Sequence, residues 1–89
     1  MKIKKYIYPE GNGGRVFAVD NEGKSIFGYD ADILAENSTD VTLNGAKPIF
    51  GINWGGIGTQ TPKDTELFIK VLQEAVVLCR KLDALHDTK

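Results

Sequence analysis

The feature that most constrains the fold of this 89-residue chain is a stretch, residues 62–86, whose apolar side chains recur at helical spacing. No glycine or proline interrupts the chain after Pro62. Thr61 suits the N-cap, Pro62 suits the first helical position, and Asp64 lies in the first turn, where the helix dipole favours an anion. We therefore predict one long amphipathic helix over residues 62–86.

The apolar sector of this helix is unusually wide. At about 100° per residue it spans roughly 200°, twice what a helix lying on a single sheet needs. Either the sheet curls around the helix, or the second flank meets another chain. Because a small sheet is poorly suited to wrapping a helix and two-fold dimers are the commonest assembly, we predict a homodimer. Its expected interface is formed by Leu67, Val71, Leu78 and Leu85.

The residues before the helix predict short strands joined by turns. Asp20–Lys24 has the form of a hairpin turn with Gly23 in a left-handed conformation, and Asn44-Gly45 is a second hairpin motif. Segments rich in β-branched and aromatic residues lie at 2–8, 15–20, 25–29, 41–43 and 48–54. Between them, Asp30 is expected to cap one helical turn, residues 30–36, that buries Ile33 and Leu34.

These elements predict one α+β domain over residues 1–89. A β-meander covers about residues 2–54, a glycine-rich turn follows at 55–61, and the helix covers about 62–86. The expected architecture is a small antiparallel sheet of four to five strands packed against one long C-terminal helix. Phe50, Ile52 and Trp54 alternate onto one face of their strand, which we expect to seat the helix.

Composition restricts the setting of the protein. Hydrophobic residues make up 42% and charged residues 26%, as in ordinary globular proteins. Cys79 is the only cysteine, which rules out a disulfide within the chain and fits a reducing compartment. No apolar run approaches the length of a membrane span, and the apolar segment after the basic start is too short for a signal peptide. We expect a cytoplasmic protein with no membrane partner.

The charge distribution suggests partners. The net charge of −1 leaves no general basic surface, which argues against nucleic acid as a partner. Between residues 20 and 40, however, six acidic residues face one cation, Lys24. This segment is either a solvated loop or a surface that steers a partner. The candidate partner-binding residues are Asp30, Asp32, Glu36 and Asp40.

The sequence contains no pattern typical of catalysis or metal binding. Cys79 and His86 lie two helical turns, or about 10 Å, apart, too far for a nucleophile and its base. Asp30, Asp32 and Glu36 lack the further oxygen ligands, glycine and terminal glutamate of a calcium loop. We therefore expect no enzyme, no metal and no cofactor.

The turn before the helix is the alternative place for a ligand. Glycines there free backbone amides, threonines offer hydroxyls, and a helix N-terminus favours a phosphate. The competing interpretation is a tight turn with a helix cap, and the pattern matches neither a Walker A loop nor a dinucleotide fingerprint. The candidate ligand-binding residues are Gly55, Gly56, Gly58, Thr59 and Thr61.

The aromatic residues admit two interpretations as well. Tyr6, Tyr8, Tyr29 and Trp54 either form a contact surface, as aromatics do at binding hot spots, or complete a small core.

The segment Ile52–Asp64 resembles a pattern in short uncharacterised proteins of phages and prophages. In those proteins a strand ending in Asn-Trp leads through a Gly–Thr/Ser turn to a helix that starts with proline and an acidic residue. The resemblance covers the C-terminal part of the chain and implies no reaction. It implies a setting, because phage accessory proteins of this size are often inhibitors of host proteins, including anti-CRISPR and other anti-defence proteins.

Two functions are therefore expected. The first is a non-enzymatic, phage-type interaction protein that occludes the surface of a host protein. The alternative is a module that binds or sequesters a small ligand or nucleotide at the turn Gly55–Thr61.

Overall fold

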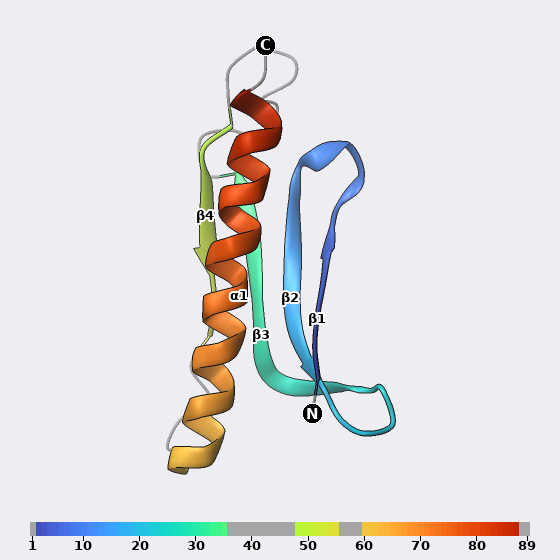
Figure 1. Cartoon of the computed structure of the whole chain (residues 1–89), viewed down its shortest axis with the longest axis vertical. Coiled ribbons are helices and arrows are strands. Elements are labelled where there is room, and N and C mark those ends of the chain that lie inside the picture. Colours follow the sequence, from blue (N-terminus) through green and yellow to red (C-terminus); the bar gives the residue numbers. More distant parts are fainter. Residues whose placement is uncertain (1, 36–47, 56–59, 88–89) are drawn as a thin grey trace.

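The computed structural model of this chain describes residues 2–35, 48–55 and 60–87 (Figure 1). Its described strands form one antiparallel sheet in the order β1-β2-β3-β4, and α1 lies across one face of that sheet. The predicted α+β fold is thus confirmed. The elements are β1 (Lys2–Ile7), a short 3-10 helix η1 (Pro9–Gly11), β2 (Gly13–Val19), β3 (Ser25–Ala35), β4 (Phe50–Asn53) and α1 (Pro62–Asp87).

The predicted hairpin turn between β2 and β3 is confirmed. The Asp20 amide donates to the Lys24 carbonyl at 2.8 Å, and the Gly23 amide donates to the Asp20 carbonyl at 3.0 Å. The Asp20 side chain accepts the amides of Glu22 and Lys24 at 2.8 and 3.0 Å, as aspartates commonly do in turns. Gly23 has the expected positive φ, 85°.

The prediction of a helical turn at residues 30–36 is wrong. Residues 25–35 form the continuous strand β3, and its side chains alternate, so that Ile33 is fully buried while Leu34 is 42% exposed. The physical reason is that β3 pairs with β2 on one side and β4 on the other, and these backbone hydrogen bonds satisfy the chain more completely than one capped turn.

The start of β3 is irregular. The register with β2 shifts between Phe17 and Val19, because Phe17 lies opposite Asp30 whereas Val19 lies opposite Ser25. Gly28 takes a positive φ of 87° there, a conformation that glycine adopts without strain. The strand bends sharply at this end (Figure 1), and Phe27 is left 95% exposed.

The fourth strand is shorter than expected. It covers Phe50–Asn53, and Pro48, which has no backbone donor, lies before it. The hairpin predicted around residues 41–45 lies outside the described residues.

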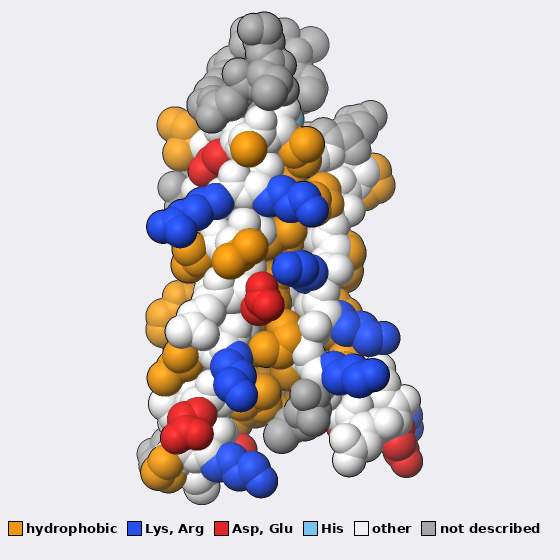
Figure 2. Space-filling view, viewed as in Figure 1, with side chains coloured by type: hydrophobic (Ala, Val, Ile, Leu, Met, Phe, Trp, Pro, Cys, Tyr) orange, Lys and Arg blue, Asp and Glu red, His pale blue; other side chains and the backbone are white. Residues whose placement is uncertain are grey.

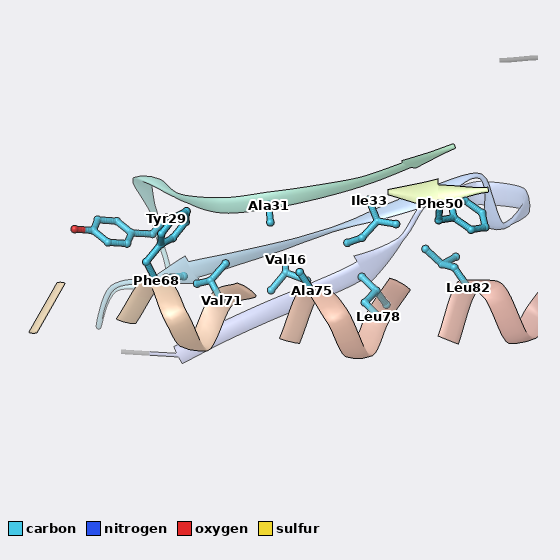
Figure 3. Close-up of a cluster of buried hydrophobic side chains, with 11 residues drawn as sticks. Val16, Tyr29, Ala31, Ile33, Phe50, Phe68, Val71, Ala75, Leu78 and Leu82 are labelled. Atoms are coloured by element: carbon cyan, nitrogen blue, oxygen red, sulfur yellow. The ribbon is translucent and has the colours of Figure 1, made fainter. Parts of the chain in front are cut away.

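The core lies between the sheet and α1. The side chains of Phe68, Val71, Ala75 and Leu82 point from the helix toward the sheet (Figure 3). The rings of Tyr29 and Phe68 meet edge to face at a centroid distance of 6.0 Å. The buried cluster comprises Val16, Ala18, Tyr29, Ala31, Ile33, Phe50, Phe68, Val71, Ala75, Leu78 and Leu82. Phe50 belongs to this cluster and Ile52 packs against it. The ring centroids of Trp54 and Phe68 lie 5.4 Å apart. The strand face predicted to seat the helix therefore does so.

The core also changes the predicted dimer interface. Val71 and Leu78 are 0% and 3% exposed because they are packed under the sheet, so they have no surface to offer a second chain. Leu67 is half-buried against the core, and Leu85 is 53% exposed. Apolar side chains nevertheless remain on the surface of the helix (Figure 2). The exposed ones are Ile69, Val76, Val77 and Leu85.

Candidate functional site

The face of the sheet opposite α1 is not covered by any described element. Strand alternation sends every second side chain to this open face. The pairing registers bring Tyr6 of β1, Arg15 of β2 and Asp32 of β3 into one row across three strands, and Phe17 and Asp30 into the next. We call these residues, with Tyr8 just after β1, the open-face cluster.

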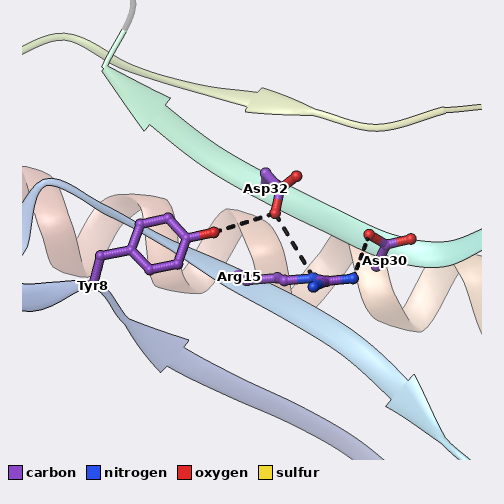
Figure 4. A network of polar contacts seen from close by, with 4 residues as sticks. All are labelled: Tyr8, Arg15, Asp30 and Asp32. Atoms are coloured by element: carbon purple, nitrogen blue, oxygen red, sulfur yellow. Dashed lines mark hydrogen bonds and ion pairs between the residues drawn. The ribbon is translucent and has the colours of Figure 1, made fainter. Parts of the chain in front are cut away.

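Arg15 holds the polar part of the open-face cluster together (Figure 4). Its Nη2 lies 3.0 Å from an Asp30 carboxylate oxygen, and its Nε lies 3.8 Å from an Asp32 carboxylate oxygen. The Tyr8 hydroxyl donates to the same Asp32 oxygen at 3.4 Å. One cation thus lies between two carboxylates, and a phenol from a third segment completes the network.

The protonation states of this network follow from its geometry. Burial, and then the negative charge of Asp32, raise the pKa of Tyr8 above its ordinary value of 10.0. The phenol therefore stays protonated near neutral pH and acts as a donor. Burial opposes the charge on Arg15, but the Asp30 carboxylate, together with smaller contributions from Tyr6 and Asp32, outweighs it, so the pKa of Arg15 is raised above its ordinary value.

The aromatic part of the open-face cluster is continuous with the polar part. Tyr6 contacts Tyr8 at 5.5 Å and Phe17 at 6.1 Å between ring centroids, in both cases edge to face. The Arg15 guanidinium carbon lies 5.5 Å from the centroid of the Phe17 ring, within the range of a cation–π contact. Tyr6 remains 46% exposed. The open face thus offers solvent an ordered set of aromatic rings and charges.

The predicted partner-binding residues divide into two groups. Asp30 and Asp32 do lie on a common exposed face, but both form ion pairs with Arg15, so this surface is less acidic than the sequence suggests. Glu36 and Asp40 lie outside the described residues. Sequence reasoning missed the role of Arg15. The alternation of side chains along β2 and β3 places Arg15 beside Asp30 and Asp32 only if residues 30–35 are interpreted as a strand.

The alternative ligand site is only partly described. Thr61 acts as the predicted helix cap, because its hydroxyl accepts the Asp64 amide at 3.2 Å. Gly55 is exposed. Gly56, Gly58 and Thr59 lie outside the described residues, so anion binding at this turn stays a prediction.

Cys79 and His86 both lie near Phe50 but make different polar contacts. The Cys79 thiol lies 3.7 Å from the Phe50 carbonyl oxygen. His86 Nε2 lies 2.9 Å from the Gly11 carbonyl oxygen, which links the end of α1 to the turn between β1 and β2. Within the described ranges, no three His, Cys, Asp or Glu side chains group closely enough to hold a metal ion. No helix of the same ranges is long and apolar enough to cross a membrane.

Comparisons with known proteins found no matching family model, no matching curated protein and no matching solved structure.

Proposed function

We propose that this chain is a non-enzymatic interaction protein that binds another protein through the open face of its sheet. The observation that carries the proposal is the open-face cluster, which combines exposed aromatic rings with an arginine held between two carboxylates. Tyrosine and arginine are enriched among the residues that dominate binding energy at protein interfaces.

The geometry of the cluster favours binding because little order has to be gained. Tyr6, Arg15 and Phe17 lie on paired strands, and ring contacts and ion pairs fix their side chains before any partner arrives. A surface organised in this way loses less side-chain entropy on association than a set of free side chains.

The resemblance of residues 52–64 to phage and prophage proteins supports a setting for this activity. We propose that the partner is a host protein, for instance one that acts in defence against phages, and that the chain inhibits it by covering its surface. Two proteins that bury about 800 Å² each on association leave that area closed to other partners.

Affinity capture tests this proposal. The immobilised chain and a Tyr6→Ala variant are each exposed to host lysate, and bound proteins are identified by mass spectrometry. Affinity for the purified partner is then measured by calorimetry. Because Tyr6 is exposed in the cluster, Tyr6→Ala should weaken binding by about 2 kcal/mol, or roughly thirtyfold in Kd.

The matched control is Arg80→Ala, which truncates an exposed side chain of α1, the element on the opposite face of the sheet. This control should bind like the unchanged chain. Equal affinity of the Tyr6→Ala variant and the unchanged chain, or a loss only in the Arg80→Ala variant, would remove the open face from the proposal.

A further inference from the structure

A second surface lies between β1 and α1, on the other face of the sheet. There a groove of about 310 Å³ is lined by Ile3 of β1 and by Lys70, Gln73, Glu74 and Val77 of α1. Figure 2 shows lysine and arginine side chains around an apolar trough between the helix and the first strand. Val77 is 53% exposed, so part of the apolar lining faces solvent.

The charge around this groove is positive although the whole chain carries −1. On the side of α1 toward β1, helical spacing places Lys63, Lys70 and Lys81 together. Their acidic neighbours are Glu66 and Glu74, and Glu74 is paired with Lys5 at 3.4 Å. Strand β1 adds Lys2 and Lys4, which are exposed at the same edge of the sheet but on its opposite face, since Lys4 pairs with Phe17.

Strand β1 is an edge of the described sheet, and its free backbone groups can be assigned. The Tyr8 amide donates to the Gly13 carbonyl, and hydrogen-bonded positions alternate along an antiparallel pair. Residues 2, 4 and 6 therefore bond to β2, whereas the backbone groups of Ile3 and Lys5 point away from it. The side chains of Ile3 and Lys5 lie on the helix side of the sheet, beside the groove.

We propose that this edge and groove bind an extended, acidic peptide segment of a partner protein, which adds to the sheet beside β1. An added strand would pair with the free backbone groups of Ile3 and Lys5, as peptides do in β-augmentation. Because its side chains alternate, those on one side enter the groove against Val77 and those on the other lie beside Lys2 and Lys4. The chemistry of the site thus selects alternating apolar and acidic residues.

Lysines on an edge strand also occur where they only prevent aggregation. Here the edge adjoins an apolar groove whose wall also carries Lys70, which a purely protective edge does not need. Nucleic acid fits less well, because no aromatic ring lines the groove to stack on bases and Glu74 stands in its wall.

The test uses a fluorescent peptide that alternates valine and glutamate and matches the six residues of β1 in length. Binding to the full chain is followed by fluorescence anisotropy. Lys4→Glu should weaken binding about fivefold by reversing one cross-strand charge pair. Lys24→Glu, the same change in the β2–β3 turn, should have no effect. Raising the salt concentration should weaken binding as well.

A second matched pair tests the groove itself. Val77→Asp places a carboxylate in the groove lining, and it should weaken peptide binding by about fivefold or more. Val76→Asp makes the same change at the neighbouring helix position, which does not line the groove, and should leave binding unchanged. Both positions are partly exposed, so both variants should fold.

Several results would overturn the proposal. They are a peptide that fails to bind at millimolar concentration, an equal loss in Lys4→Glu and Lys24→Glu, or an equal loss in Val77→Asp and Val76→Asp. Binding of an oligothymidylate in place of the peptide, with the same sensitivity to Lys4→Glu, would assign the site to nucleic acid instead. The Val77→Asp result is independent of the open-face proposal, because Val77 lines the groove on the helix side of the sheet. Lys4 pairs with Phe17 of the open face, so the open face is tested separately by Tyr6→Ala.

Discussion

Arg15 is the residue on which the order of the open face depends. Among the described residues it is the cation that contacts both Asp30 and Asp32, and it also lies over the Phe17 ring. Its Nε is buried without a hydrogen-bond partner among the described residues. Ion pairs at such half-exposed positions add little to stability, so the value of this arrangement lies in the positions it gives to the surrounding side chains.

Tyr8 provides a pH-dependent test of the network. Because its pKa is raised in the folded state, its contribution to stability is present below about pH 10 and is lost as pH rises through the folded pKa. Tyrosine ionisation is followed by absorbance in the unchanged chain and in Tyr8→Phe. We expect the difference between the two titrations to show a tyrosine whose pKa lies above the ordinary value of 10.0. The free energy of unfolding, measured with urea, should fall between pH 8 and pH 11 by less in Tyr8→Phe than in the unchanged chain. Ionisation of Tyr8 at or below its ordinary pKa would contradict the network.

Gly14 determines how closely β1, β2 and α1 approach one another. A Cβ at this position would lie 2.7 Å from the Tyr6 carbonyl oxygen and 3.0 Å from a Leu78 methyl. Gly14→Ala should therefore destabilise the fold by about 1–3 kcal/mol, the usual cost of overpacking, as measured by urea unfolding. Gly55→Ala is the control, because no atom of the described residues beyond its chain neighbours lies within 4 Å of the position a Cβ would take. Equal stability of the two variants would mean that Gly14 is not a close-packed position.

At the scale of elements, the start of α1 is decided locally. Thr61 caps the helix through the Asp64 amide. Thr61→Ala should cost about 1 kcal/mol of unfolding free energy. Thr65→Ala is the matched control, because the Thr65 hydroxyl bonds back to the Thr61 carbonyl inside the helix. Such bonds do not favour helices, and alanine is the better helix former. A loss in Thr65→Ala as large as in Thr61→Ala would argue against the cap.

Strand β3 shows the opposite case, an element that its own residues do not specify. Asp30 resembles a helix cap, and Ile33-Leu34 resembles the buried side of a helical turn. Both neighbours of the strand, β2 and β4, come from other parts of the chain. Their backbone pairing decides the conformation, and such pairing is not visible in a short window of sequence.

At the scale of the whole molecule, the width of the helical apolar sector still predicts a homodimer. The sheet uses the middle of that sector, and the side toward β4 keeps Ile69 and Val76 exposed at 48% and 38%. We expect light scattering at high micromolar concentration to give twice the mass of a single chain. Ile69→Lys combined with Val76→Lys should return the monomer without loss of stability. A monomeric unchanged chain would contradict the dimer.

The candidate surfaces could be predicted only in part. The sequence singled out Asp30, Asp32, Tyr6 and Tyr8 as possible contact residues, and the structure places all four on the open face. It did not indicate Arg15, because its residues predict a helical turn at 30–36, and only a strand there places Asp30 and Asp32 beside Arg15. The sequence does not predict the groove either. Ile3 and Val77 are far apart in the chain, and only the packing of α1 beside β1 brings them together.

The sequence by itself determined the elements that local chemistry encodes. These are the capped helix, the turn at residues 20–24, the strand face that seats the helix, and hence the α+β class. Tertiary structure alone decided how the wide sector of the helix is used. Val71 and Leu78 became core, while Val76 and Val77 stayed exposed on opposite sides. The reason is that periodicity specifies which side chains are apolar, whereas the sheet, built from distant strands, determines which of them are removed from water.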